Sequence, residues 1–147
     1  MAADKPLFLV TIPSHLVHVA AARNFLKAIC KTHALDEDTI EGVALAVHEA
    51  ITNVIRHGHR HDHDKTITLT CSFSTEQLEI HILDEGPPFD ITAVPDLDPA
   101  ELRVGGRGVF LMRTLFDELG CQPRPEAGND LRLVKRCALK LPSPTVG

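Results

Sequence analysis

The segment from Leu45 to Gly58 constrains the fold most, because it carries two different faces at helical spacing. Glu49, Asn53 and His57 are four residues apart, which stacks them along one side of a helix. The opposite side is apolar and comprises Ile40, Val43, Ala44, Val47, Ile51 and Val54. Such a stripe must be buried against a partner layer. The sequence therefore predicts an amphipathic helix that ends near Gly58 and displays polar side chains on its outer side.

The N-terminal part of the chain predicts a strand followed by a helix. Residues 7–12 form a short apolar run that ends at a proline, which suits a strand at a sheet edge. Residues 15–32 then repeat apolar positions at helical spacing, and Ser14 is the expected N-cap. The central helix begins in an acidic cluster, where Asp38 and Glu41 are the expected capping pair.

The second half of the chain predicts, in order, a hairpin, a lid, a helix and a last strand, at residues 66–82, 86–104, 109–119 and 131–139. The hairpin follows from strict alternation of apolar and polar residues. The lid follows from a run rich in Pro, Asp and Gly without periodicity, which we expect to be mobile. Gly120 is the expected C-terminal stop of the helix.

Composition and charge narrow the class of protein. A chain of 147 residues with 44% hydrophobic residues can form one domain with its own core. The formal net charge of −5 argues against nucleic acid as the main partner, because phosphate backbones are bound by basic surfaces. We find no segment of transmembrane length and no leader, so we expect no membrane contact and a cytoplasmic protein. The four separated cysteines are expected to be reduced thiols.

The segment His59–Lys65 alternates histidine and aspartate. These side chains could bind a metal, and metal storage is one reading of the segment. Alternate positions of an irregular loop do not converge on one ion without help, so a solvated loop is favoured.

Two further motifs are compatible with nucleotide binding, although each is also an ordinary turn. Asp84-Glu-Gly-Pro-Pro-Phe89 follows the second strand of the hairpin. Gly105-Gly-Arg-Gly108 leads directly into a helix, whose first N–H groups and dipole can bind phosphate. Neither motif is the P-loop or the dinucleotide fingerprint.

Taken in this order, the motifs resemble the GHKL ATP-binding fold of gyrase, MutL and histidine kinases, over about residues 6–140. Within it, Glu49-Ala-Ile-Thr-Asn53 and the Gly-Gly-Arg-Gly segment most resemble the anti-sigma-factor serine kinases of the RsbW and SpoIIAB type. The resemblance implies one histidine kinase-like ATPase domain over residues 1–147 with an ATP lid at about 86–108. It implies a two-layer α/β sandwich, with helices on one face of a mixed, mostly antiparallel sheet.

The resemblance also implies roles for individual residues. Asn53 corresponds to the ligand of Mg²⁺, and Glu49 to the carboxylate that accepts the proton of the attacking hydroxyl. Asp84 corresponds to the acceptor for the adenine amino group. The implied nucleotide-binding residues are Asn53, His57, Asp84, Gly86, Gly105, Gly106, Arg107, Gly108 and Arg23. Arg23 matches an arginine that relatives carry near the partner and the terminal phosphate.

The sequence departs from the family at two places. Many relatives begin the last strand with a threonine that supports the adenine-binding aspartate, whereas this chain has Gly128-Asn-Asp-Leu131. Val109 replaces a more usual leucine, which is a change of packing only.

The implied function is a serine protein kinase and anti-sigma factor that uses ATP and Mg²⁺ and regulates transcription by partner switching. Its implied partners are a sigma factor and a phosphorylated anti-anti-sigma protein of the STAS type, and the family favours a homodimer. One rival reading is a binding module of the same fold without phosphoryl transfer, against which the retained Glu49 argues. Another is the catalytic domain of a histidine kinase, although we expect no histidine-bearing dimerisation helix before residue 6.

Overall fold

The computed structural model describes residues 7–89 and 107–137. Its helices and strands, in chain order, are β1 (Leu7–Pro13), a 3-10 turn (Leu16–His18), α1 (Val19–Thr32), α2 (Glu37–Asn53), a π turn (Val54–Gly58), β2 (Thr66–Phe73), β3 (Gln77–Leu83), α3 (Arg107–Leu115), β4 (Glu118–Pro123) and β5 (Asn129–Arg136).

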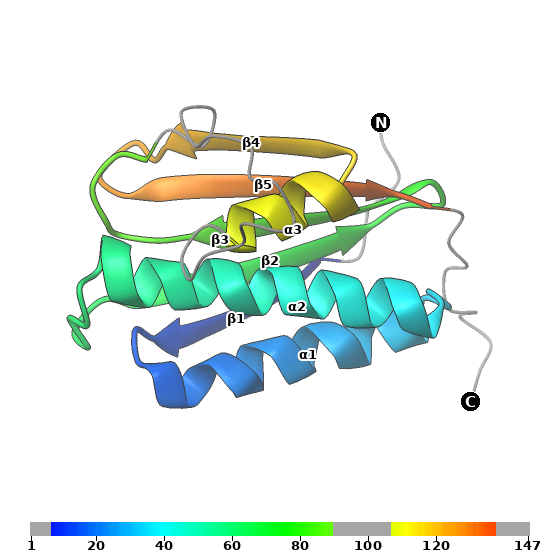
Figure 1. Ribbon diagram of the computed structural model, residues 1–147, viewed down its shortest axis with the longest axis horizontal. Coiled ribbons are helices and arrows are strands. Elements are labelled where there is room, and N and C mark those ends of the chain that lie inside the picture. The colour runs from blue at the N-terminus through cyan, green and yellow to red at the C-terminus, as the bar shows by residue number, and fades with distance from the viewer. Residues whose placement is uncertain (1–6, 90–106, 138–147) are drawn as a thin grey trace.

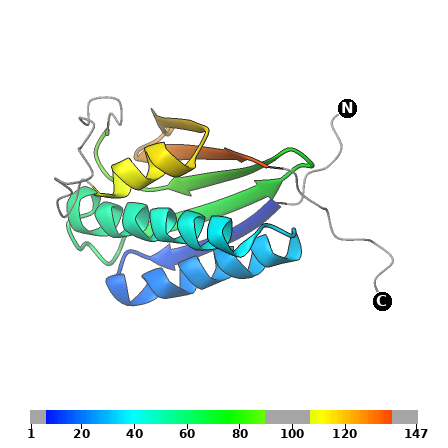
Figure 2. The same cartoon turned by 45° about the vertical axis from the view of Figure 1, so that its right-hand side comes forward.

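The described strands form one sheet in the order β1-β2-β3-β5-β4. The three helices lie side by side on one face of this sheet, with α2 between α1 and α3 (Figures 1 and 2). The predicted two-layer sandwich is therefore confirmed, as are the hairpin of β2 with β3 and the edge position of β1. Every pairing among the described strands is antiparallel, so the parallel pair that a mixed sheet requires is absent from this part of the chain.

The core forms where the alternating strands meet the apolar stripe of α2. Along β2, every second residue from Ile67 to Phe73 is buried, as strict alternation requires. Five of the six residues predicted for the buried face of α2 are 2% exposed or less, whereas Val54 is only partly buried. A Cβ atom added at Gly42 would lie 3.1 Å from Leu115, which shows how closely α2 and α3 pack.

Two predicted helix caps are wrong. Asp36, rather than Asp38, is the N-cap of α2, and its carboxylate accepts the Thr39 N–H at 2.6 Å. Ser14 caps no helix, because the His15 side chain accepts the Val17 N–H at the start of the 3-10 turn. In both regions neighbouring polar residues can act as the cap, and spacing alone does not show which of them accepts the backbone N–H.

The predicted helix at residues 109–119 is wrong in its second half. Helix α3 ends at Leu115, and the next residues form β4, which pairs with β5. Gly120 is consequently a strand residue and not a helix stop. Leu119 and Cys121 pack against the core from alternate positions of β4, whereas in the sequence Leu119 had extended the helical rhythm of the apolar residues before it.

None of the described helices is both long and apolar enough to cross a membrane. The cysteines are thiols rather than disulfides, and Cys30 and Cys71 are buried. Burial raises the pKa of the Cys30 thiol to about 12, which keeps it protonated at neutral pH.

Candidate functional site

The C-terminal end of α2 is wider than an α-helix. The α-helix ends at Asn53, and Val54–Gly58 forms a π turn, in which the His59 N–H bonds to the carbonyl of Val54 at 2.7 Å. The predicted end near Gly58 is therefore confirmed, but the last turn is π rather than α, so the regular four-residue spacing of Asn53 and His57 on one face needs correction. Asn53 and His57 nevertheless line the same cavity.

Asp84, at the end of β3, is 7% exposed and organises the turn that follows it. Its Oδ1 atom accepts the Gly86 N–H at 2.8 Å, the Asn129 N–H at 3.2 Å and the Asn129 side-chain Nδ2–H at 3.1 Å. Among the described residues, no hydrogen bond reaches its Oδ2 atom. Within the described residues, one carboxylate oxygen of Asp84 is thus used to hold the turn and the second has no hydrogen-bond donor.

Two glycines allow the backbone to pack closely around Asp84. Gly128 has a φ of +98°, and a Cβ atom there would lie 1.9 Å from the carbonyl oxygen of Asp84. At Gly86 a Cβ atom would lie 3.2 Å from the carbonyl oxygen of Gly58, so this turn lies directly against the end of α2. Arg124 donates from its guanidinium to the Asp84 carbonyl at 2.8 Å. The turn is held between α2 and the β4–β5 hairpin.

A cavity of about 330 Å³ opens between the end of α2, the turn after β3 and helix α3. Its polar groups are the carboxylate of Asp84, the amides of Asn53 and Asn129, and the imidazole of His57. The remaining lining is mostly apolar and consists of Ala50, Val54, Gly58, Ile82, Pro87, Pro88, Phe89, Val109, Met112, Cys121 and Leu131. An apolar cavity with a few convergent polar groups suits a flat heterocycle with an exocyclic amine.

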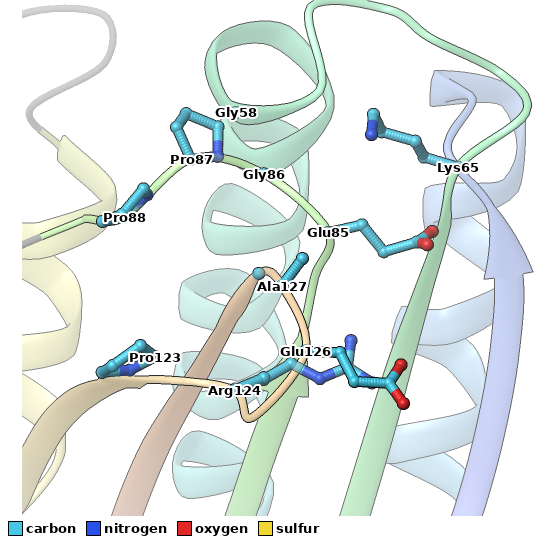
Figure 3. Close-up of a pocket in the computed structure, with 11 residues that line it drawn as sticks. Gly58, Lys65, Glu85, Gly86, Pro87, Pro88, Pro123, Arg124, Glu126 and Ala127 are labelled. Atoms are coloured by element: carbon cyan, nitrogen blue, oxygen red, sulfur yellow. The ribbon is translucent and has the colours of Figure 1, made fainter.

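A second cavity, of about 520 Å³, lies on the other side of the Gly86–Pro88 segment. Its lining includes Lys65, Arg124 and Glu126, and it contains neither Asp84 nor Asn53 (Figure 3). We assign the candidate site to the smaller cavity, because it combines the polar groups predicted from the sequence with an apolar wall.

The other residues predicted for the site do not all line this cavity. Glu49 is half-buried on α2, one helical turn before Asn53, and is not part of the cavity lining. Arg23, on α1, donates to Nδ1 of His48 at 3.2 Å and lies outside this lining. Arg107 and Gly108 begin α3. Gly105 and Gly106, with lid residues 90–106, lie outside the described residues.

Asn129 was not predicted as a site residue. It occupies the first position of β5, where relatives were expected to have a threonine, and it supports Asp84 instead. Its side chain also donates to the Pro87 carbonyl at 2.8 Å and accepts the Phe89 N–H at 3.1 Å. No sequence signal marked this residue, because the positive φ of Gly128 and its close approach to Asp84 are visible only in the structure.

The histidine-rich loop after α2 contains one buried residue. His59 is 3% exposed, whereas His61 and His63 are exposed. In the part of the chain that the structure describes, no group of three or more His, Cys, Asp or Glu side chains could hold a metal ion. Residues 60–64 of the loop are exposed, whereas His59 is buried and Lys65 is half-buried.

Comparison with known proteins supports the same reading of the fold. Residues 12–135 match the model of the histidine kinase-like ATPase domain. The serine-protein kinase RsbW of Listeria innocua is 30% identical over 116 residues, which are 74% of this chain and 74% of the kinase. RsbW of Bacillus subtilis is 30% identical over 119 residues, covering 76% of this chain and 74% of that kinase.

Solved structures share the fold at lower identity. A Mycobacterium tuberculosis protein solved with its RsbU and RsbW domains superposes with a TM-score of 0.63 at 15% identity, covering 94% of this chain and 33% of that longer one. The histidine kinase domain of a blue-light activated histidine kinase from Erythrobacter litoralis gives a TM-score of 0.52 at 22% identity, covering 84% and 61% of the two chains. The resemblance to RsbW-type proteins is thereby confirmed, and this chain belongs to the histidine kinase-like ATPase domain family.

Proposed function

We propose that this protein binds Mg-ATP in the cavity beside Asp84 and transfers the terminal phosphoryl group to a serine of a partner protein. The observation that carries the proposal is the arrangement of Asp84, whose Oδ1 is occupied by N–H groups while its carboxylate lines the cavity. A carboxylate oxygen in an apolar cavity is the acceptor that an adenine amino group requires.

The end of α2 supplies the groups suited to phosphate chemistry. Asn53 offers a carboxamide oxygen, a ligand type that hard divalent cations accept, at the wall of the cavity. When bound with the nucleotide, Mg²⁺ neutralises phosphate charge. Glu49 lies one turn earlier on the same helix and is the proposed base for the acceptor hydroxyl. Phosphoryl transfer needs mainly positioning and charge neutralisation, so this small set of groups suffices.

The remaining predicted site residues are assigned to the phosphates, to the base and to the partner surface. Helix α3 begins at Arg107, directly after the glycines Gly105 and Gly106, and its first N–H groups are the proposed phosphate contacts together with Gly108. Gly86 is proposed to admit the base close to the backbone, since it carries no side chain and even a Cβ atom there would lie 3.2 Å from the backbone of Gly58. Arg23 is assigned to the partner surface, where His48 fixes its guanidinium.

The proposed acceptor is a small anti-anti-sigma protein of the STAS type, and the proposed second partner is a sigma factor that is held inactive. The support is the similarity to proteins named serine-protein kinase RsbW. A homodimer is proposed on the same basis. The alternative is a module of this fold that binds nucleotide or a partner without transfer.

Two variants one helical turn apart test the proposal. Glu49→Gln keeps the shape of the side chain but removes the base, so ADP and ATP should bind as before while transfer falls by roughly 10² to 10⁴. Asn53→Ala removes the proposed metal ligand, so both Mg-ATP binding and transfer should fail.

The measurement is transfer of labelled phosphate to the STAS-type proteins of the source organism, with nucleotide titration in parallel. Equal nucleotide affinity in wild type and Asp84→Asn would remove the site assignment. Binding without transfer to any acceptor, unchanged by Glu49→Gln, would establish the alternative of a non-catalytic module.

A further inference from the structure

The buried imidazole of His59 joins three segments that are distant in the sequence. Its Nδ1 atom lies 2.7 Å from Oγ of Ser14, a fully buried residue between β1 and the 3-10 turn. Its Nε2 atom accepts the backbone N–H of Glu85 at 2.9 Å, in the turn after β3. His59 itself directly follows the π turn, and its N–H bonds to the carbonyl of Val54. One ring therefore connects the end of α2, the end of β1 and the Asp84–Gly86 turn.

These contacts define the protonation state of the ring. A backbone N–H can only donate, so Nε2 of His59 must be unprotonated, and the proton of the neutral ring is on Nδ1 and points to Ser14 Oγ. A protonated imidazolium would have an N–H at both positions. It would lose the bond to Glu85 and direct two donors toward each other.

Two successive backbone N–H groups follow Asp84 in this turn. The Glu85 N–H donates to His59, and the Gly86 N–H donates to Oδ1 of Asp84. The Glu85 carboxylate points away from this turn toward β2 (Figure 3), where it accepts the Thr66 N–H at 2.6 Å. The turn is thus fixed on its inner side by Asn129 and on its outer side by His59 and Thr66.

We infer that His59 is a positioning residue for the base-binding turn, and that its neutral Nδ1–H form holds Glu85 and thereby Asp84 in the orientation that accepts the ligand. The inference rests on the proposed nucleotide function of the Asp84 cavity. His59 does not line the cavity, so the affinity for the ligand depends on the charge of a buried ring that lies outside the cavity lining.

The surroundings of the ring favour the neutral form. Burial lowers the pKa of His59 below its ordinary value of 6.5, and Lys65 acts in the same direction. The carboxylates of Asp84, Glu85 and Asp62 oppose this shift without reversing it. The neutral ring therefore persists through pH 6.5, and protonation sets in only at lower pH.

The test compares two substitutions of His59 in the full-length protein. His59→Gln retains an amide that can accept from Glu85 and donate to Ser14 but does not titrate. His59→Phe retains a ring without polar atoms and leaves both partners unpaired, which should weaken Mg-ADP binding by about tenfold or more. His63→Gln, an exposed histidine of the same loop, is the matched control.

Mg-ADP affinity is measured by titration calorimetry between pH 5 and pH 8. At pH 8 we expect His59→Gln to bind Mg-ADP within about threefold of wild type. Toward pH 5 the ratio of wild-type to His59→Gln affinity should fall by up to about tenfold, because the protonated ring of the wild type loses its hydrogen bond to the Glu85 N–H. Titration of the phosphates is common to both proteins and cancels in the ratio. A ratio that stays constant while the ring itself gains its proton, or unchanged affinity in His59→Phe, would overturn the inference.

A readout without nucleotide separates this inference from the proposed function. Nitrogen chemical shifts of the His59 ring report its tautomer, and the exchange rate of the Glu85 amide proton reports its hydrogen bond. Exchange should accelerate as His59 titrates and should be fast at every pH in His59→Phe. If wild type binds no nucleotide but shows this coupling, the proposed function fails while the role of His59 in fixing the turn stands. If Glu85 exchange is independent of His59, the positioning role fails even where nucleotide binds.

Discussion

The side-chain amide of Asn129 donates a hydrogen bond of 3.1 Å to the same oxygen of Asp84 that accepts its backbone N–H at 3.2 Å. One residue thus supplies two donors to the carboxylate on which the candidate site depends. The same side chain contacts the backbone of Pro87 and Phe89, so it also fixes the chain as it leaves β3 toward the lid.

Replacement of Asn129 by alanine should therefore weaken Mg-ADP binding by about tenfold to a hundredfold, because a bond to a charged group contributes about 1.5–3 kcal/mol. Asn129→Thr retains a hydroxyl donor and should bind more tightly than the alanine variant. Titration calorimetry gives the affinities, and Asn24→Ala, an exposed change on α1, is the control. Wild-type affinity in Asn129→Ala would show that the backbone donors suffice.

Gly128→Ala should destabilise the whole domain. The alanine would adopt a φ of +98° with its Cβ atom 1.9 Å from the Asp84 carbonyl, so the β4–β5 hairpin and the turn after β3 must separate. The strained backbone alone costs about 1–3 kcal/mol, which lowers the melting temperature of a chain of this size by several degrees. Gly120→Ala in β4 is the control, since a Cβ atom there meets nothing within 4 Å. Equal melting temperatures for the two variants would contradict the observed packing.

The outer face of the sheet makes stability depend on pH through His81. Burial of this ring opposes its charge, but Glu79 and Asp130, each 2.7 Å from one ring nitrogen, raise its pKa above the ordinary value of 6.5. A group whose pKa is higher in the folded state stabilises the fold fully below pH 6.5 and loses this contribution as the pH rises through the folded value. Urea denaturation should thus show a larger difference between wild type and His81→Gln at pH 6 than at pH 9. The exposed change His63→Gln is the control, and a difference that grows with pH would refute the assignment.

Removal of divalent cations should weaken nucleotide binding by at least about tenfold, because triphosphate charge would otherwise lie near Glu49 and Asp84 without compensation. The measurement is ATP titration with Mg²⁺ and with excess chelator. Asn53→Ala should abolish most of the difference between the two conditions. Equal affinity of wild type with chelator would count against Asn53 as a metal ligand.

The sequence predicted those parts of the fold in which one periodicity dominates. Strict alternation in β2 and the apolar stripe of α2 leave a single way to bury their side chains. The strand β4 was missed because Leu119 fits both a helical and an alternating pattern, and its pairing with β5 is decided by contacts distant in the sequence.

In the candidate site, too, residues placed by a local motif were predicted, and residues placed by contacts distant in the sequence were not. Asp84 and Asn53 could be predicted because a motif places them, and both line the cavity. Asn129 and His59 could not, because their importance lies in hydrogen bonds to Asp84 and Glu85, which are 45 and 26 residues away, respectively. Composition and spacing contain no information about such bonds.

The π turn at Val54–Gly58 makes the length of this segment more critical than its composition. Removing one residue would let the helix continue as an ordinary α-helix, and every later position would rotate by about 100° about its axis. His59 would then point away from Ser14 and Glu85 even though its own side chain and theirs were unchanged. We therefore expect this segment to tolerate several substitutions and no single-residue deletion. The number of its residues sets the distance between α2 and the turn after β3.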